Sequence, residues 1–317
     1  MVLCLYCQRK VWRMRKSLIK FFIFFLILFG VFFSGLFYLY SKEPNRAIVK
    51  IFVTYYKPYP LPVKGEILQP IQVGRAIENE QFYSGHLSKT DIDWLHDYTI
   101  GDDTGDNISA KNRSFDVLTA YYWVWKHYQE IGNPKYVGFF AHRKILMPET
   151  EECCVFDKSA PDFGLTTQGL EKVLNKHKVI VNAWIPWVGK KYASVFDQYK
   201  DCSVHHVEDF MAMIEIIRRD YPEMLDSLIN VAYDVGRSYA VWNFWIMEKD
   251  LAFDYFERLF HVMFELEKER GEIIAQYDLK QRRVFGYLAE RFFAIWLEFQ
   301  QRTNGIEPFV AKAMLLD

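Results

Sequence analysis

Residues 21–40 most constrain this chain, because their twenty side chains, FFIFFLILFGVFFSGLFYLY, include no charge. An α-helix rises about 1.5 Å per residue, so this segment spans about 30 Å, the thickness of a bilayer's hydrocarbon core. A cleaved signal peptide has a shorter apolar core and a cleavage site of small residues, whereas this stretch ends in Tyr38, Leu39 and Tyr40. The stretch therefore predicts a retained transmembrane helix, with the lipid bilayer as the partner of residues 21–40.

Basic residues flank this segment unevenly. The residues before it include no acid and six bases, namely Arg9, Lys10, Arg13, Arg15, Lys16 and Lys20. Only Lys42 and Arg46, offset by Glu43, follow it closely. Cytoplasmic flanks carry the excess of positive charge, so we expect a type II protein with its amino terminus in the cytoplasm. The predicted organisation is a basic tail at 1–20, the helix at 21–40, a stem at 41–50 and a globular domain at 51–310.

The formal net charge of −1 combines this basic tail with a mildly acidic remainder. Nucleic-acid binding needs a basic face or stripe, so nucleic acid is not expected as a partner of the globular part. In the predicted topology, Cys153, Cys154 and Cys202 face an oxidising lumen, where they can form one disulfide and leave one free thiol.

The globular part alternates strand-like and helix-like segments. Short runs of β-branched and aromatic residues predict strands at 47–55, 136–140 and 178–184. Apolar residues at helical spacing predict a helix at 115–130, for which Asn112 and Ser114 are natural caps. Beyond His206 the pattern predicts helices at 207–220, 222–230, 250–270 and 279–301, with a strand-like segment at 238–247. This order indicates an α/β fold: a mainly parallel twisted sheet flanked by helices, with its ligand at the carboxyl ends of the strands.

Two polar segments could bind a phosphorylated ligand. The loop GDDTGDNISAKN at 101–112 precedes a helix, so its N–H groups could meet a phosphate while Asp and Asn side chains take a ribose or a base. The alternative for this loop is a capped turn. His142, Arg143 and Lys144 directly follow the strand at 136–140, where a cationic cluster could neutralise phosphate without a metal. The alternative for this cluster is a basic surface turn.

Other carboxylates fit structural roles as well as chemical ones. Asp91 and Asp93 form a D-x-D pair, but the polar stretch before them ends no buried strand, which favours a helix cap over a metal site. The H-H-x-E-D cluster at 205–209 could hold zinc, although acids at a helix start are ordinary dipole partners. Asp278 could be a general base or an N-cap. It belongs to a polar set that also includes Tyr277, Gln281, Arg283, Glu290 and Arg291.

Eight segments in a fixed order together resemble a known family. They are IFVTYYKPYPLP (51–62), PIQVGRA (70–76), TGDNISAKN (104–112), LTAYYWVWK (118–126), YVGFF-AHRK (136–144), HHVEDF (205–210), WNFWIMEKDLAFDYFERLF (242–260) and YDLKQRRVFGYLAERFFAIWLE (277–298). The chain resembles the bacterial "domain of unknown function 4422" proteins, which are grouped with GT-A-fold glycosyltransferases and are common among surface-polysaccharide genes.

The resemblance implies a GT-A-like sheet and a nucleotide-sugar donor site built from the first strand and the DNIS loop. Within that loop, Asp106, Asn107, Ser109 and Lys111 are the implied donor-binding residues, and Asp278 would lie near the acceptor. Two departures from the family pattern are Ala141, in place of the first residue of H-Y-R-R, and Val117, in place of a glutamate.

The interpretation that follows is a type II Golgi glycosyltransferase, or alternatively an enzyme of the bacterial inner membrane. It would transfer a hexose from a nucleotide diphosphate sugar, here taken as a UDP-sugar, to a glycan acceptor. His142, Arg143 and Lys144 would stabilise the leaving group, Asp278 would be the base, and no divalent metal is expected.

A non-catalytic, lectin-like or scaffolding descendant of the fold is the main alternative, which Ala141 and Val117 favour. A glycan hydrolase is less consistent with the sequence, because no pair of carboxylates stands at a recognisable spacing.

Overall fold

The computed structural model describes residues 29, 48–59, 65–82, 84–148, 164–182, 191–236 and 242–315. Apart from Phe29, the predicted transmembrane segment lies outside these residues, as do Cys153 and Cys154. Cys202 is a free, half-buried thiol. Among the described residues, we find no helix that combines the length and the apolar character needed to cross a bilayer. The anchor and the topology inferred from it therefore stay predictions.

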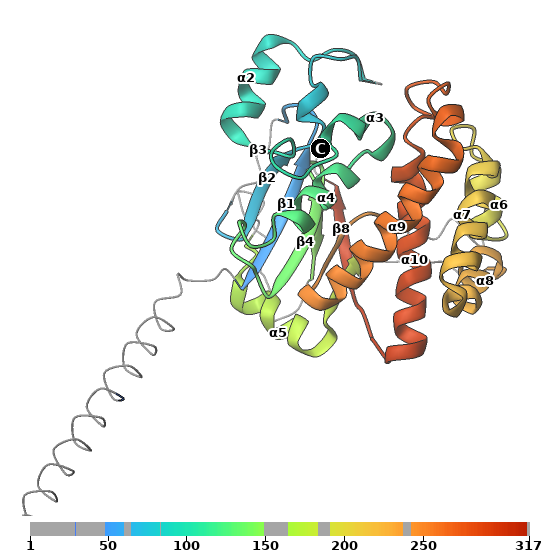
Figure 1. The fold of residues 1–317 in the computed structure, drawn as a ribbon. Helices are drawn as coiled ribbons and strands as arrows, with labels where there is room; N and C mark the ends of the chain where they lie inside the picture. Colours follow the sequence, from blue (N-terminus) through green and yellow to red (C-terminus); the bar gives the residue numbers. More distant parts are fainter. Residues whose placement is uncertain are drawn as a thin grey trace, which may run out of the picture. The chain divides into compact units, whose positions relative to one another are not determined.

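Eight strands form the sheet among the described residues (Figure 1). In spatial order they are β3 (Ile100–Gly101), β2 (Leu68–Gln72), β1 (Val49–Tyr55), β4 (Tyr136–Ala141), β5 (Lys144–Met147), β8 (Phe309–Leu315), β6 (Val179–Asn182) and β7 (Trp245–Glu248), and β4 also pairs with β7. Strands β3, β2, β1 and β4 run parallel, as predicted. The pairs β4–β5, β4–β7, β5–β8 and β6–β7 are antiparallel, so "mainly parallel" is wrong for the second half of the sheet.

The central strands are buried on both faces. In β1, Phe52 packs in one apolar cluster while Ile51 and Val53 pack in the other, because successive side chains of a strand point to opposite faces. Phe139 and Phe140 divide in the same way on β4. The near-continuous apolar runs read from the sequence therefore reflect a sheet that is covered on both sides.

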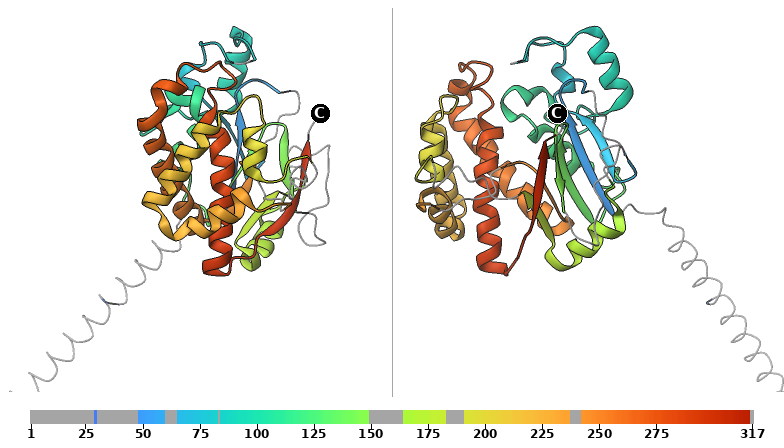
Figure 2. Two further views of the ribbon diagram at one scale, coloured as in Figure 1. Left: turned by 90° about the vertical axis from the view of Figure 1, so that its right-hand side faces the viewer. Right: turned by 180° about the vertical axis from the view of Figure 1, so that it is seen from behind.

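Helices cover both faces of the sheet. They are α2 (Lys89–Tyr98), α3 (Asn112–Phe115), α4 (Leu118–Lys126), α5 (Thr167–His177), α6 (Val195–Lys200), α7 (Val207–Asp220), α8 (Leu225–Tyr233), α9 (Lys249–Ile274) and α10 (Val284–Asn304), with short 3-10 turns η1 (Arg75–Ile77), η2 (Ser109–Lys111) and η3 (Pro222–Met224). Buried residues of α4, α9 and α10 belong to the apolar cluster that contains Phe52. Buried residues of α2 and α5 belong to the cluster on the other face, which contains Ile51. Figure 2 shows α7 to α10 gathered on one side of the sheet, where α10 contacts α7, α8 and α9.

Most predicted elements are confirmed, with shifted ends. The strands at 47–55, 136–140 and 178–184 and the helix at 207–220 correspond to β1, β4, β6 and α7. The strand-like segment at 238–247 yields β7, which begins at Trp245, and the helix predicted from residue 279 begins at Val284. Strands β2, β3, β5 and β8 were not predicted.

The helix predicted at 115–130 is wrong in one respect that matters for the site. It is broken between α3 and α4, because Asp116 has a positive φ of 53°. Neither Asn112 nor Ser114 caps α4, whose N-cap is Val117 and has no side-chain cap. Instead, Nδ2 of Asn112 donates to the carbonyl oxygen of Asp116 at 2.7 Å and so holds the break in place.

Gly138 lies in the middle of β4, where a side chain has no room. A Cβ atom there would stand 2.8 Å from both the carbonyl oxygen of Trp245 and the Cγ1 atom of Ile246 on the paired strand β7. We expect Gly138→Ala to lower the free energy of unfolding by about 1–3 kcal/mol, as overpacking does in other cores. Urea unfolding followed by tryptophan fluorescence measures this effect.

Gly271→Ala is the matched control, since its Cβ atom would meet only the Cγ atom of Glu267, at 3.4 Å on helix α9. Alanine is the better helix former by up to about 1 kcal/mol, so this variant should be neutral or more stable. Equal destabilisation by the two substitutions would contradict the packing described for β4 and β7.

Candidate functional site

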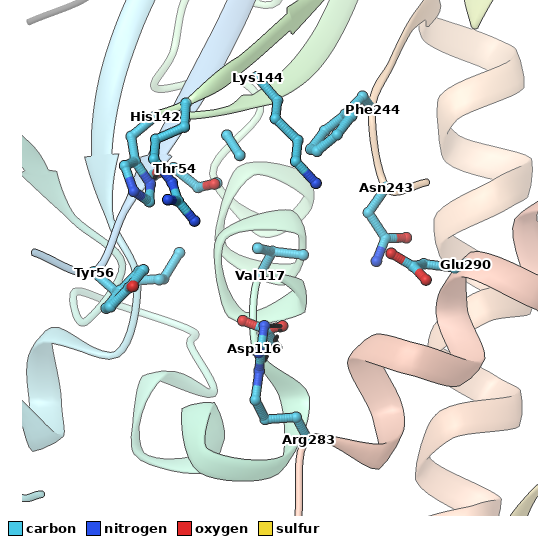
Figure 3. A pocket seen from close by; sticks show the side chains of 13 residues that line it. Thr54, Tyr56, Asp116, Val117, His142, Lys144, Asn243, Phe244, Arg283 and Glu290 are labelled. Carbon is cyan, nitrogen blue, oxygen red and sulfur yellow. Dashed lines mark hydrogen bonds and ion pairs between the residues drawn. The ribbon is translucent and has the colours of Figure 1, made fainter. Parts of the chain in front are cut away.

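A cavity of about 180 Å³ opens at the carboxyl ends of β1, β2 and β4, the edge of the sheet at which a ligand was expected (Figure 3). Its other walls come from the start of α4, the segment before β7 and helix α10. The lining residues are Thr54, Tyr56, Val73, Asp116, Val117, Ala141, His142, Arg143, Lys144, Asn243, Phe244, Arg283 and Glu290. The structure thus brings His142, Arg143 and Lys144 to one cavity, as the sequence predicts.

Arg143 and Lys144 supply the positive charge of this cavity. Ala141 pairs with Lys144 across a two-residue turn at the end of β4, and Arg143 at that turn is exposed. The ammonium group of Lys144 lies 4.6 Å from the ring centre of Trp242 and 5.5 Å from that of Phe244. Burial lowers the pKa of Lys144 from its ordinary value. Among the described residues, no carboxylate forms an ion pair with either cation, so both can bind an anionic ligand.

His142 lines the same cavity but adds no charge at neutral pH. Its side chain is 5% exposed, and the rings of Tyr55, Tyr56 and Tyr59 lie around it, with centres 5.3 to 5.6 Å away. Burial lowers the pKa of His142 to about 4, and Arg143 and Lys144 act in the same direction. Nδ1 lies 3.3 Å from the carbonyl oxygen of Thr54 and so carries the proton. Nε2 is left as a buried acceptor with no partner among the described residues.

Asp116 and Arg283 form the wall of the cavity beneath Val117 (Figure 3). One carboxylate oxygen of Asp116 accepts from Nε of Arg283, at 3.1 Å, and from its Nη2. The side chain of Asp116 packs against Gly286 of α10, where a Cβ atom would stand 2.8 Å from the Cβ atom of Asp116. Sequence reasoning missed Asp116 because it lies inside a segment with helical periodicity, and a carboxylate there reads as a solvated face.

Glu290 faces the cavity from α10. Its side chain is 27% exposed, and one oxygen accepts from Nη1 of Arg291 at 2.8 Å. Burial raises the pKa of Glu290 to about 7, against the opposing effects of Arg291 and Lys144. The sequence places Arg283, Glu290 and Asp278 in one polar set. It does not show which of them line the cavity, and the structure places Arg283 and Glu290 there.

A second, smaller cavity adjoins the first. It is lined by Tyr56, Phe82, Asn112, Arg113, Asp116, Leu279 and Arg283, and it shares Tyr56, Asp116 and Arg283 with the first. The guanidinium of Arg113 stacks 3.9 Å from the ring centre of Phe82, and Nη2 donates to the carbonyl oxygen of Ile77 at 3.1 Å. Nη1 of Arg113 is buried without a partner among the described residues. The ion pair of Asp116 and Arg283 therefore stands between two adjoining cavities.

The four predicted donor-binding residues of the 101–112 loop line neither cavity. Asp106 accepts from the hydroxyl of Tyr122 at 3.0 Å, and Lys111 forms an ion pair with Glu267 at 2.6 Å. Asn107 donates to two carbonyl oxygens of its own loop and accepts from the backbone of Ser109. These contacts fit the capped-turn alternative, so the donor-binding role of these residues stays a prediction.

Asp102 anchors this loop to the end of β2. Its buried carboxylate accepts from the backbone N–H groups of Gly74 and Arg75, at 2.8 and 3.1 Å, and from the hydroxyl of Ser109 at 2.5 Å. Burial raises the pKa of Asp102, and these hydrogen bonds oppose the shift. The hydrogen bond to Asp102 gives the fully buried hydroxyl of Ser109 a structural role.

Asp278 does not reach the cavity that holds the cations. It is exposed, and its carboxylate accepts from the backbone N–H groups of Lys280 and Gln281, both at 2.8 Å. These contacts fit the capping alternative, in the turn before α10. Its role as the base stays without structural support.

The remaining acidic motifs also have structural roles. Asp91 completes a capping box with Ser88 at the start of α2, which confirms the helix-cap interpretation, and Asp93 pairs with Lys89 at 2.6 Å. In the 205–209 cluster, Asp209 pairs with Arg270 of α9 at 2.5 Å. In the part of the chain that the structure describes, no three His, Cys, Asp or Glu side chains gather into a group that could hold a metal ion.

Comparisons with known proteins agree with this geometry. The family model described as domain of unknown function (DUF4422) matches residues 50–302. An apo structure of the bifunctional glycosyltransferase WbbM is similar, with a TM-score of 0.70 and 26% sequence identity. The match covers 85% of this chain and 45% of that one, so the chain spans less than half of WbbM's length. No curated protein matches the chain. The likeness shows a glycosyltransferase-like α/β fold.

The surroundings of His142 predict an unusual titration. We expect its imidazole to stay neutral down to a pH near 4, with the proton on Nδ1. Because this pKa is lowered from 6.5 in the folded chain, the neutral ring contributes stability that is lost as pH falls from 6.5 towards 4. Long-range ¹H–¹⁵N spectra of the histidine-labelled chain, assigned with His142→Gln, can follow this ring. A ring that titrates near pH 6.5 would contradict the burial described.

Proposed function

The chain belongs to the DUF4422 family, and from that premise we propose that it is a glycosyltransferase. The proposed reaction moves a hexose from a nucleotide diphosphate sugar, here a UDP-sugar, to a glycan acceptor. One observation carries the proposal: Arg143 and Lys144 line a cavity at the carboxyl end of β4 without a carboxylate partner among the described residues. The similarity to a glycosyltransferase structure supports the same class of activity.

The chemistry of sugar transfer needs positive charge at this place. When the bond between the sugar and the diphosphate breaks, the diphosphate gains negative charge that must be stabilised. The planar guanidinium of Arg143 matches phosphate oxygens with two parallel hydrogen bonds, and Lys144 adds a compact charge. Residues 141–144 contain no carboxylate that would hold a divalent cation here, so these two side chains are proposed to act in its place.

The shape of the site suggests how the donor lies. A nucleotide sugar has its diphosphate between nucleoside and sugar, so a site whose cations lie in the middle must extend to both sides. On one side lies the second cavity, where Tyr56 and Phe82 offer aromatic surface to a nucleoside. On the other side lie Asn243 and Glu290, which are placed to contact the sugar and its acceptor.

A non-catalytic, lectin-like role is the second candidate. Ala141 and Val117, where the chain departs from the family pattern, both line the cavity, so the lost side chains would have pointed towards the ligand. A protein that binds the donor but never consumes it would fit this alternative. Turnover of the donor separates the two functions.

Binding of the donor should stabilise the full chain. A ligand that binds only the folded state, present at about 100 times its Kd, stabilises that state by about 2.7 kcal/mol. We therefore expect a panel of nucleotide sugars in a thermal-unfolding assay to raise the Tm with UDP-sugars, and free UDP to do the same. The absence of a shift with every nucleotide would oppose a donor site of any kind.

Turnover of the donor should depend on Arg143 and not on an added metal. Removing one donor of hydrogen bonds to a transition-state anion costs about 10²-fold or more elsewhere, and we expect that loss in kcat for Arg143→Ala. Arg218→Ala is the matched control, because Arg218 is exposed on α7 and pairs with Glu215. Excess EDTA and the double substitution Asp91→Ala/Asp93→Ala should change little. If EDTA abolished activity and Mn²⁺ restored it, the proposed position of the donor's diphosphate beside Arg143 and Lys144 would be wrong.

A further inference from the structure

We propose that Glu290 is the general base, the group that takes the proton from the attacking hydroxyl of the acceptor. This inference rests on the proposed function and names a catalytic residue within the same cavity. Figure 3 shows the Glu290 carboxylate beside Asn243, across the cavity from Tyr56 and His142, with Lys144 between them. A base in this position would face the sugar end of a donor whose diphosphate meets Arg143 and Lys144.

The contacts of Glu290 hold the carboxylate in place and leave one oxygen available. Nη1 of Arg291 donates to Oε2 at 2.8 Å, and Arg291 is itself fixed by Gln198, at 2.6 Å, and by the carbonyl oxygen of Tyr287, at 3.0 Å. Oε1 of Glu290 has no hydrogen-bond partner among the described residues. Partial burial disfavours the ionised form, which raises the proton affinity of this carboxylate towards the range in which a base works best at neutral pH.

The other carboxylates near the site are less suited to this role. Asp116 accepts two donors of Arg283 on one oxygen, in a wall that the ion pair and Gly286 keep rigid. This carboxylate is therefore already engaged in an ion pair with Arg283. Asp278 is exposed, caps the turn before α10 and lines neither cavity. Both cavity carboxylates are partly buried, but Asp116 accepts two hydrogen bonds from Arg283, whereas Glu290 accepts one, from Arg291.

The proposed step balances as a single displacement. The acceptor oxygen forms a bond to C1 of the sugar while its proton passes to Oε1 of Glu290. The bond between C1 and the phosphate oxygen breaks, and its electron pair leaves with the diphosphate, beside Arg143 and Lys144. Because the acceptor attacks the face opposite the leaving group, the configuration at C1 inverts.

The test uses the purified full chain, a UDP-hexose that it consumes, and release of UDP with water as the acceptor. Glu290→Gln should lower kcat by about 10²- to 10⁴-fold, the usual contribution of a general base. The Kd for UDP should change less than about threefold, which a merely structural role would not predict. Glu298→Gln is the matched control, since Glu298 is a buried carboxylate of the same helix outside both cavities, and it should keep kcat within about threefold.

Azide gives a second readout, because this anion attacks carbon without losing a proton. With Glu290→Ala, azide should restore consumption of the donor at least about tenfold and form a glycosyl azide of inverted configuration, identified by ¹H NMR. The wild-type kcat/KM, which reports the free chain, should fall as pH drops below about 7, and this dependence should vanish in Glu290→Gln. Melting temperatures of the variants report whether they fold.

Each outcome decides the assignment. A Glu290→Gln variant that folds and keeps at least a third of the wild-type kcat would overturn it, and so would a variant that loses UDP binding together with activity. Lack of azide rescue, or retention of configuration in the wild-type product, would also overturn it. A wild-type chain that binds UDP-sugars but consumes none would instead defeat the proposed function itself.

Discussion

The short turn between β4 and β5 is the constraint on which the site depends. Ala141 pairs with Lys144, so only His142 and Arg143 connect the two strands, and a connection this short forces them to be antiparallel. The two side chains of this turn differ in burial. His142 packs among tyrosine rings as a neutral group, and Arg143 remains in solvent at the mouth of the cavity. The same turn ends the parallel half of the sheet, and β5, which follows the turn, pairs antiparallel with β8.

Two carboxylates, the buried Asp102 and the half-buried Asp116, hold segments next to the site in place. Asp102 ties the 101–112 loop to the end of β2, and Asp116 ties the start of α4 to Arg283 before α10. Each carboxylate costs free energy to bury, and each recovers part of that cost through charged or backbone donors. The positive φ of Asp116 is a local strain. The ion pair with Arg283 holds this conformation, and Gly286 permits it because a side chain there would collide with Asp116. Strain of this kind, at the border of two cavities, is consistent with a site whose walls are built for a ligand.

The sequence predicted the parts of this architecture that depend on local patterns. Runs such as 47–55 and 136–140 identify buried strands because their residues are apolar on both faces, and Arg143 and Lys144 stand out because they follow such a strand directly. Asp116 and Glu290 could not be recognised in this way. Each lies within or beside a helix, where an acidic residue is usually solvated, and only the packing of α10 against α3 brings them to one cavity. Asp106 and Asp278 show the opposite ambiguity, since polar residues at loops and helix starts are as well suited to caps as to ligands, and their proposed roles stay predictions.

The opposed charges of the cavity suggest an order of events. Lys144 lowers the pKa of Glu290, so part of the acidity of this carboxylate comes from a cation that the proposed donor would neutralise. A diphosphate bound to Arg143 and Lys144 removes that influence and adds negative charge of its own. Both changes raise the proton affinity of Glu290 once the donor is in place, and partial burial keeps the coupling strong, because the local dielectric is lower than in water. A higher proton affinity makes the ionised carboxylate of Glu290 a stronger base for the acceptor hydroxyl, but it also lowers the fraction of Glu290 that is ionised at neutral pH, so the gain in rate is confined to pH values near and above the raised pKa.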